Sequence, residues 1–350
     1  MKNNTCLLTI SVPTYNRANL LERQLENLLN QVGQHNGIEI LVCDNYSNDK
    51  TQEVVEKYQK KNNCLKYFRQ KKNEGLDKNV LSCYENAKGD FVWFLSDDDI
   101  IFDDAVTQIL KEIKKTNFTV MAYSFCNSNN KENCKKNIQV RTHTSFTDKK
   151  SIEDFFKVIM ISTLVLKKID IDIDKLKTLP STIFPQITLS LNLLQKDFIL
   201  IANEKNILWR EAGYESGNFF ELYCLKPREA IRYSKISLDE KKDLLKFSEK
   251  SLKEFLKLSI LERVGFYKSK KGFPFNNLTS AIGEYKNSLL NLLYVITIFF
   301  ISKTPRKFIL SVVLLNIAIK NLSIKKAFIY KENLDNHIKL NVSKAKSSDV

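Results

Sequence analysis

Disulfide pairing and zinc binding find little support in the amino-acid sequence. Its 350 residues include seven cysteines, an odd number, and no two of them form a C-x-x-C pair. The three histidines, His35, His143 and His337, are widely separated, so the ligand spacing of a zinc site is missing as well. The sequence therefore favours reduced thiols, as is usual in cytoplasmic proteins.

Glycine and proline are also scarce, at 9 and 6 residues. Together with 43% hydrophobic and 27% charged residues, this scarcity excludes a linker-rich or disordered chain and indicates an ordered globular protein. No glycine follows the first predicted strand, where a dinucleotide-binding G-x-G-x-x-G would begin, and no P-loop is present. Any nucleotide site must therefore be built from another motif.

A long hydrophobic leader is missing too. The apolar stretch at residues 6–12 is too short for a signal peptide and runs directly into Pro13. We expect this stretch to be the first strand and the chain to stay in the cytoplasm.

Positive charge is in excess, with 55 Lys and Arg against 40 Asp and Glu, a formal net charge of +15. Most of this excess is expected to be solvated surface. Three anionic partners would fit the remainder: nucleic acid, an anionic membrane surface, or a phosphate-bearing substrate. No known nucleic-acid recognition motif accompanies the charge, so a nucleic-acid partner is not expected.

Short apolar runs alternate with helical patterns over the first 125 residues. The runs predicted as strands are residues 7–12, 38–43, 65–68, 91–95 and 118–125. This alternation is typical of βαβ units, and it predicts an α/β fold with a mainly parallel sheet flanked by helices. We expect one domain over residues 1–225 and a helical, Lys-rich region over residues 226–350.

Two apolar runs in the C-terminal region, residues 287–302 and 308–319, are each bordered by Lys or Arg. Both are shorter than the roughly 17 to 25 residues of a spanning helix. They are compatible with core helices, with helices lying in an anionic membrane interface, or with a short spanning hairpin.

Polar residues follow each of the first four predicted strands, where ligands bind in open α/β sheets. The polar segments are residues 13–17, 44–49, 73–75 and 96–99. Asp97, Asp98 and Asp99 would repel one another strongly unless a cation or solvent relieves them, and Mg²⁺ or Mn²⁺ prefers such oxygen ligands. The acids could instead cap the next helix, and Asp44 alone could be a turn residue or a contact to a ribose or base.

Taken together, the segments 10–17, 40–51, 73–75 and 89–99 resemble the family 2 glycosyltransferases with the GT-A fold. Within that family the chain is similar to enzymes of bacterial surface-polysaccharide assembly, such as lipopolysaccharide or capsule synthesis, including an abequosyltransferase-like group. The resemblance implies a hexosyl- or deoxyhexosyltransferase that moves a sugar from a nucleoside diphosphate sugar to a glycan or lipid-linked acceptor, inverting the anomeric centre. It further implies an enzyme peripheral on the inner face of the cytoplasmic membrane.

The resemblance also implies roles for individual residues. The implied donor-binding residues are Pro13, Thr14, Tyr15, Arg17, Asp44, Asn45, Asn73, Gly75, Asn79 and Asp97. Asp98, with Asp99, would hold Mg²⁺ or Mn²⁺, although Ser96 stands where many members have Asp. Family members often place an acidic general base well beyond the metal motif. Glu211 and Glu215, in a Gly-containing and therefore loop-like stretch, are the candidates here, and the alternative is that they are surface loop acids. A metal-dependent nucleotidyltransferase and a non-catalytic nucleic-acid-binding protein remain as alternatives.

Overall fold

The computed structural model describes residues 6–33, 35–127, 139–146, 148–182, 184–210 and 226–246. They belong to one compact unit formed by Met1–Tyr214 and Lys226–Phe247. No helix in this described part is long and apolar enough to cross a membrane. The two C-terminal apolar runs lie outside the described residues, so their three interpretations remain predictions, as does the boundary at residue 225.

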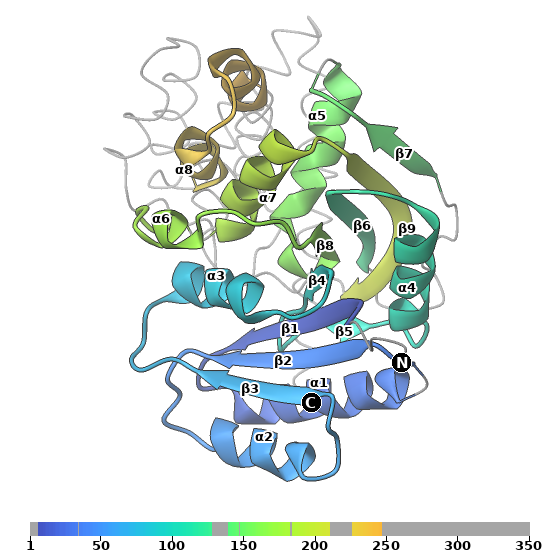
Figure 1. Ribbon diagram of the computed structural model, residues 1–350, viewed down its shortest axis with the longest axis vertical. Coiled ribbons are helices and arrows are strands. Elements are labelled where there is room, and N and C mark those ends of the chain that lie inside the picture. Colours follow the sequence, from blue (N-terminus) through green and yellow to red (C-terminus); the bar gives the residue numbers. More distant parts are fainter. Residues whose placement is uncertain are drawn as a thin grey trace, which may run out of the picture. The chain divides into compact units, whose positions relative to one another are not determined.

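A nine-stranded sheet forms the centre of the described part (Figure 1). Its strands are β1 (Leu8–Thr14), β2 (Ile38–Asp44), β3 (Leu65–Arg69), β4 (Phe91–Phe94), β5 (Ile100–Ile101), β6 (Val120–Asn127), β7 (Val140–His143), β8 (Leu164–Lys167) and β9 (Leu200–Arg210). Their order is β3-β2-β1-β4-β8-β6-β9-β5, and β7 also pairs with β9. Only β5, β7 and β8 run against the others, so the predicted mainly parallel sheet is confirmed.

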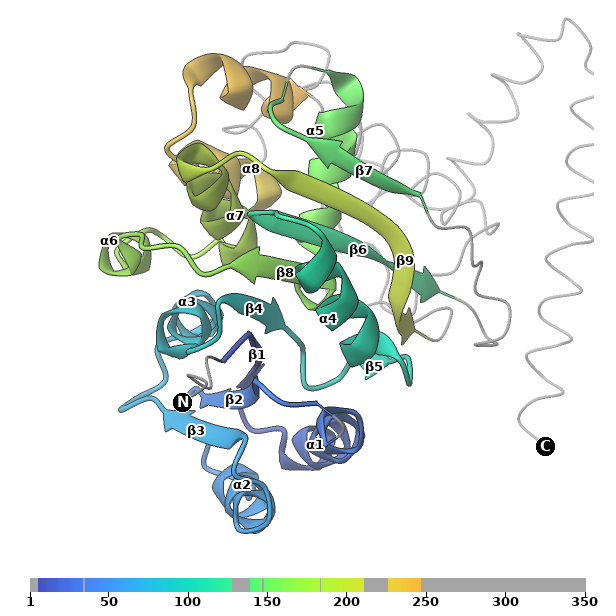
Figure 2. The ribbon, with the colours of Figure 1, turned by 45° about the vertical axis from the view of Figure 1, so that its right-hand side comes forward.

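Helices flank this sheet (Figure 2). The α-helices are α1 (Ala18–Val32), α2 (Thr51–Gln59), α3 (Leu76–Asn86), α4 (Ala105–Lys115), α5 (Lys149–Phe155), α6 (Ile173–Lys177), α7 (Pro185–Lys196) and α8 (Lys226–Tyr233), and the short 3-10 helices are η2 (Phe156–Ile159) and η3 (Ile161–Thr163). Helices α1 and α2 lie on one face of β1, β2 and β3, and α3 lies on the other (Figures 1 and 2).

Helix α1 shows how the sequence pattern produces this packing. Leu21, Leu25 and Leu28 recur at the helical period and are fully buried in the same core as Leu8 and Ile10, which alternate along β1. Burying one such side chain stabilises the fold by about 1.5–3 kcal/mol. The helix and the first parallel strands therefore form one continuous core.

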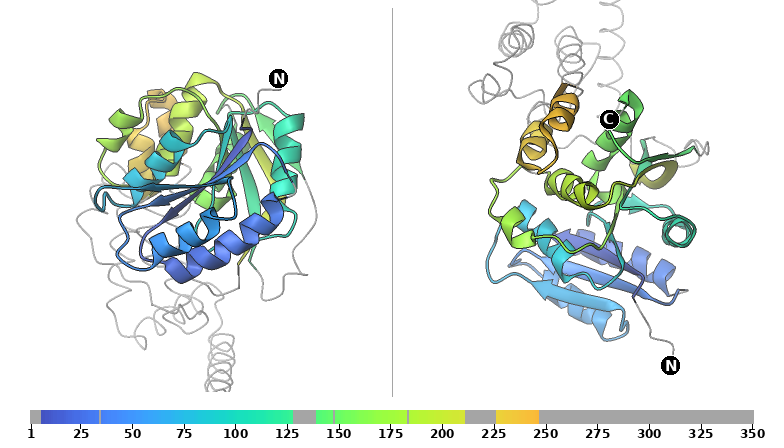
Figure 3. Two further views of the ribbon diagram at one scale, coloured as in Figure 1. Left: turned by 60° about the horizontal axis from the view of Figure 1, so that its bottom comes forward. Right: turned by 45° about the horizontal axis from the view of Figure 1, so that its top comes forward.

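Strand β8 lies between β4 and β6 and runs antiparallel to both, pairing Val165 with Trp93 on one side and with Met121 on the other. Figure 3 shows the sheet and its helices from two further directions. The reversed direction brings η3, which precedes β8, to the carboxyl end of β4. There the Trp93 indole Nε1–H donates to the main-chain oxygen of Ser162 at 2.9 Å.

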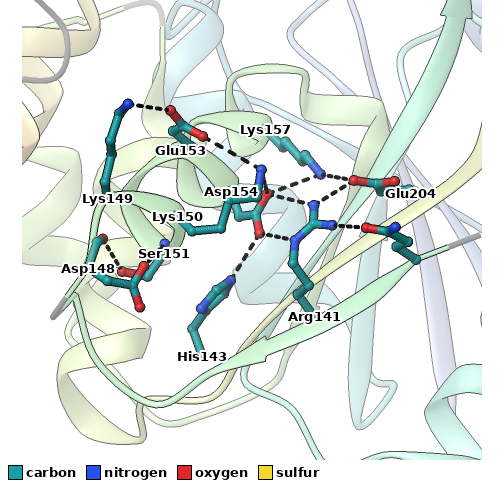
Figure 4. A network of polar contacts seen from close by, with 11 residues as sticks. Arg141, His143, Asp148, Lys149, Lys150, Ser151, Glu153, Asp154, Lys157 and Glu204 are labelled. Carbon is teal, nitrogen blue, oxygen red and sulfur yellow. Dashed lines mark hydrogen bonds and ion pairs between the residues drawn. The ribbon is translucent and has the colours of Figure 1, made fainter.

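An ion-pair network around the buried Asp154 joins β7, α5, η2 and β9 (Figure 4). The fully buried Asp154 carboxylate accepts Arg141 Nε and Nη2 at 2.7 and 3.0 Å, contacts His143 Nε2 at 3.0 Å and lies 3.2 Å from Lys157 Nζ. Arg141 Nη2 also donates to Glu204 at 2.6 Å. Arg141 therefore joins the buried Asp154 carboxylate to Glu204 of β9, which lies more than sixty residues further along the chain.

The cysteines only partly follow the expectation of reduced thiols. Cys6, Cys43, Cys64 and Cys83 are free, as predicted. Cys126, at the end of β6, is disulfide-bonded, so the prediction is wrong for this residue. An odd cysteine count without C-x-x-C spacing says nothing about which side chains the fold brings together.

Candidate functional site

The carboxyl ends of three neighbouring parallel strands meet at one edge of the sheet. Strand β1 lies between β2 and β4, with Pro13 opposite Cys43, Thr14 opposite Asp44 and Ser11 opposite Phe94. The polar segments 13–17, 44–49 and 96–99, which follow these strands, are consequently brought together as predicted.

Arg17 bridges two of the three successive acids. Its Nη1 donates to Asp97 Oδ1 at 2.9 Å and lies 3.3 Å from Asp98 Oδ2, while the Thr14 hydroxyl donates to Asp97 Oδ2 at 2.7 Å. Burial raises the pKa of the Asp97 carboxyl above its ordinary value, against the opposing effects of the Thr14 hydrogen bond and the Arg17 charge. The guanidinium thus relieves the repulsion that the sequence predicts among these carboxylates.

Residues 96–99 form the turn after β4, here called the acidic turn. Asp98 is partly exposed in it, with 20% of its side chain accessible to solvent. The Ser96 hydroxyl donates to Asp98 Oδ1 at 2.5 Å. Asp99 is buried, and its main-chain oxygen accepts the Gln24 side-chain amide at 2.9 Å. Of the two predicted metal ligands, Asp98 therefore lies at the surface and Asp99 beneath it.

A divalent cation fits Asp98 only together with a phosphate-bearing ligand. Within residues 6–246, as far as the structure describes them, no three His, Cys, Asp or Glu side chains are grouped as metal ligands. Mg²⁺ in proteins usually takes one or two carboxylates and completes its shell with substrate phosphates and water. One partly exposed carboxylate beside an arginine suits a cation that arrives with a diphosphate.

Asp44 is fully buried at the end of β2 and organises the turn that follows. Its Oδ1 accepts the Ser47 amide and hydroxyl at 2.8 and 2.5 Å, and its Oδ2 accepts the Tyr67 hydroxyl at 2.6 Å with Arg69 Nε at 3.4 Å. Burial, followed by the hydrogen bond and charge of Asp44, raises the pKa of Tyr67 far above its usual range. The phenol therefore stays protonated and donates to the carboxylate.

Sequence reasoning did not single out Tyr67 and Arg69. Their spacing could have indicated a shared role, because Tyr67 and Arg69 are two positions apart in β3 and their side chains therefore lie on the same face. The parallel register places them opposite Val42 and Asp44. What the sequence lacked was any indication that β3 would be the outer neighbour of β2.

Two exposed tyrosines lie in the turns that follow β1 and β2. Tyr15 is 41% and Tyr46 45% exposed. The Tyr46 ring packs against the Arg69 guanidinium, 4.4 Å from ring centroid to Cζ. Exposed rings in such positions offer flat faces to a nucleobase, and stacking on one ring contributes about 1–3 kcal/mol.

A pair of amides shapes the loop between β3 and α3. Asn45 Nδ2 donates to Asn73 Oδ1 at 2.8 Å, and the same oxygen accepts the main-chain N–H of Gly75 at 3.0 Å. Asn79 is buried, and its Nδ2 donates to the main-chain oxygen of Cys43 at 2.9 Å. Asn45, Asn73 and Gly75 therefore border the carboxyl ends of the strands, whereas the buried Asn79 supports the main chain at the end of β2.

Gly75 has φ 85° and ψ 168°, a conformation that residues with a side chain rarely adopt. We expect Gly75→Ala to lower the free energy of unfolding by about 1–3 kcal/mol, measured by urea denaturation. Gly33→Ala is the matched control, because Gly33 ends α1 with φ −56° and ψ −15°. Equal effects of the two substitutions would contradict the argument from backbone conformation.

The general-base candidates Glu211 and Glu215 lie outside the described residues. Strand β9 ends at Arg210, and its Trp209 pairs with Ile100 of β5. Because β5 directly follows the acidic turn, the chain leaves β9 beside that turn. Both residues remain predictions.

Comparisons with known proteins agree with this architecture. Residues 9–165 match the family model described as Glycosyl transferase family 2. A GalNAc(5)-diNAcBac-PP-undecaprenol beta-1,3-glucosyltransferase of Campylobacter jejuni is 36% identical over 106 residues, which cover 30% of this chain and 34% of that protein. The abequosyltransferase of Salmonella typhimurium is 35% identical over 101 residues, 29% of this chain and 30% of that protein. The chain thus spans about a third of the length of these relatives.

Among solved structures, TarS 1–349 of S. aureus in complex with UDP has a TM-score of 0.53 at 16% identity. The alignment covers 91% of this chain and 92% of that one. The same protein in complex with UDP-GlcNAc has a TM-score of 0.51 at 15% identity. At these identities the likeness shows the fold, which is the GT-A fold that the sequence motifs predicted.

Proposed function

Residues 9–165 of this chain are a glycosyltransferase family 2 domain with the GT-A fold, and from this premise we propose that the protein transfers a sugar from a nucleoside diphosphate donor to a glycan or lipid-linked acceptor in bacterial surface-polysaccharide synthesis. The observation that carries the proposal is the cluster at the carboxyl ends of β1, β2 and β4, where Arg17 and Asp98 lie at the surface above the buried Asp97 and Asp44. This arrangement provides both charge signs that a diphosphate with its cation requires.

Different side chains in the turns after β1 and β2 contact different parts of the donor. The exposed rings of Tyr15 and Tyr46 stack on the base, in the turns that Asp44 and its donors Ser47 and Tyr67 hold in place. Arg17, which is 48% exposed, faces the diphosphate. Thr14 and Asp97 fix the direction of the Arg17 side chain.

The Asp98 carboxylate, with Ser96 orienting one of its oxygens, is the group that would hold Mg²⁺ or Mn²⁺ against the diphosphate. When bound, such a cation stabilises the negative charge that develops on the leaving diphosphate. Arg17 adds a second positive charge at the same place. Asp99, being buried, supports the turn and does not face the donor.

Transfer proceeds by a single displacement that inverts the anomeric carbon. An acceptor hydroxyl oxygen bonds to this carbon as its bond to the diphosphate oxygen breaks, and the electron pair leaves with the diphosphate. A carboxylate takes the hydroxyl proton, and Glu211 and Glu215 are the proposed bases. Their support is chain connectivity, since they follow the end of β9 beside the acidic turn.

The acceptor is proposed to lie at the inner face of the cytoplasmic membrane, with the protein peripheral to it. The net charge of +15 and the two basic-flanked apolar runs support attraction to an anionic surface. A hexosyl or deoxyhexosyl donor is the proposed sugar class. Sedimentation with vesicles containing anionic lipid, but not with neutral vesicles, would support the membrane part of the proposal.

The donor part is tested by nucleoside diphosphate release from a panel of nucleotide sugars, with and without Mn²⁺ or Mg²⁺. We expect metal-dependent release from one donor, stimulated by glycan or lipid-linked acceptors, and a single inverted anomer in the product by NMR. Folded protein that binds and turns over no donor would contradict the proposal and favour nucleotidyl transfer or nucleic-acid binding.

A further inference from the structure

Gln24 is a polar residue on the apolar face of α1. Its neighbours on that face, Leu21, Leu25 and Leu28, are fully buried, and Gln24 itself is 3% exposed. A buried amide is costly unless its hydrogen bonds are made, and a leucine would suit the core side of this helix equally well in volume. The amide therefore needs an explanation beyond packing.

The hydrogen bonds of Gln24 provide that explanation. Its Nε2 donates to the main-chain oxygens of Ser96 at 2.8 Å and Asp99 at 2.9 Å. These two carbonyls are the first and last of the acidic turn. One side-chain amide thus spans the turn and connects it to α1, more than seventy residues earlier in the chain.

Ser162, which comes after the acidic turn in the chain, also bonds to it. It is fully buried in η3, and its Oγ accepts the main-chain N–H of Ser96 at 2.8 Å. Its main-chain oxygen accepts the Trp93 indole N–H, which fixes η3 to β4. The Ser96 hydroxyl then donates to Asp98 Oδ1, so the restraint reaches the Asp98 carboxylate.

We propose that Gln24 and Ser162 are positioning residues that hold the Ser96 to Asp99 turn, and through it the Asp98 carboxylate, in the geometry that a donor diphosphate and its cation require. The inference rests on the proposed function. Neither residue reaches the surface where the donor would bind, so each acts only through the turn. Groups that orient a metal ligand typically change metal affinity by about 10–100-fold when removed.

Gln24→Met removes both amide hydrogen bonds while keeping the side-chain length. The matched control is Gln31→Met on the same helix: Gln31 Nε2 donates to Phe102 O at 3.1 Å and its Oε1 accepts Val106 N at 3.2 Å, so it also bonds the main chain across about seventy residues but not the acidic turn. Both substitutions remove buried or half-buried hydrogen bonds and are expected to destabilise the fold by about 1–3 kcal/mol.

The readout is binding without turnover. Mn²⁺ affinity is measured by electron paramagnetic resonance in the presence of the nucleoside diphosphate that the wild type binds most tightly among UDP, GDP, CDP, ADP and dTDP. We expect Gln24→Met to weaken Mn²⁺ binding about 10–100-fold and Gln31→Met to leave it within about twofold. Ser162→Ala, with the buried Ser234→Ala as its control, gives an independent test should Gln24→Met fail to fold.

Three results would speak against the inference. Equal Mn²⁺ affinities of Gln24→Met and Gln31→Met, or of Ser162→Ala and Ser234→Ala, would overturn it while leaving the proposed function in place. A wild type that binds no nucleoside diphosphate with Mn²⁺ would overturn the proposed function and this inference with it.

Discussion

Asp98→Asn is expected to lower kcat/KM for donor consumption by about 10²–10³-fold, the range seen when one preorganised electrostatic group is removed from a site of charge development. The amide keeps the shape of the carboxylate and can still accept the Ser96 hydroxyl, so the turn stays in place. What is lost is the negative charge that attracts the cation and pairs with Arg17. The measurement is nucleoside diphosphate release at saturating and limiting metal.

Asp90→Asn is the control, because Asp90 is exposed and lies at the amino end of β4, away from the carboxyl ends that form the candidate site. We expect its kcat/KM to match that of the wild type. The free energy of unfolding of Asp98→Asn should change little, since the pair lies near the surface, with Arg17 48% and Asp98 20% exposed, and such pairs contribute about 0–1 kcal/mol. A fall in kcat/KM of less than about tenfold would remove Asp98 from the role assigned to it.

Asp154→Asn is expected to lower the free energy of unfolding by about 3–5 kcal/mol, because it leaves the partly buried Arg141, His143 and Lys157 without their common buried carboxylate. Burial alone would raise the pKa of Asp154. The hydrogen bonds from Arg141 and His143 and the nearby Lys157 overcome this effect and hold the pKa well below its ordinary value of 3.8. Urea denaturation at pH 7 measures the loss.

The pH dependence provides a second test of the same residue. A depressed folded-state pKa contributes stability that is fully present above pH 3.8 and is lost as the pH falls further. The difference between wild type and Asp154→Asn should therefore shrink by about 1 kcal/mol between pH 7 and pH 3.

Glu153→Gln serves as the control for Asp154, since Glu153 pairs with Lys149 and Lys150 at 3.8 and 3.6 Å near the surface. It is expected to cost about 0–1 kcal/mol. A loss for Asp154→Asn no larger than that of this control would mean that the network adds nothing measurable to stability.

The sequence predicted the parallel half of the fold well because that half is local in the chain. Each strand from β1 to β4 is an apolar run followed by a turn, and the observed ends differ from the predicted ones by only one or two residues. The segments 13–17, 44–49 and 96–99 were correctly placed at one edge, since parallel neighbours end together. Periodicity and strand direction suffice for both results.

The remaining features depend on contacts that periodicity does not encode. Nothing in the run Leu164–Lys167 indicates that it enters the sheet between β4 and β6, or that η3 before it would bring Ser162 to the acidic turn. Gln24 reads as an interruption of the apolar face of α1 until Ser96 is seen beside it. These residues contact segments that are far from them in the chain, and the spacing of residues in the sequence does not reveal such contacts.

The position of β8 has a consequence for how the chain folds during synthesis. The unit β3-β2-β1-β4 involves only residues 8–94, so its ladder can form while the rest of the chain is still being made. The free edge of β4, however, stays unpaired until Leu164–Lys167 has left the ribosome, and β6 waits for the same strand. During that interval the strand edges that β8 will fill stay open on both β4 and β6, a state prone to wrong pairing. The candidate site at the carboxyl ends of β1, β2 and β4 is therefore completed late in translation, although most of its residues are among the first hundred to be made.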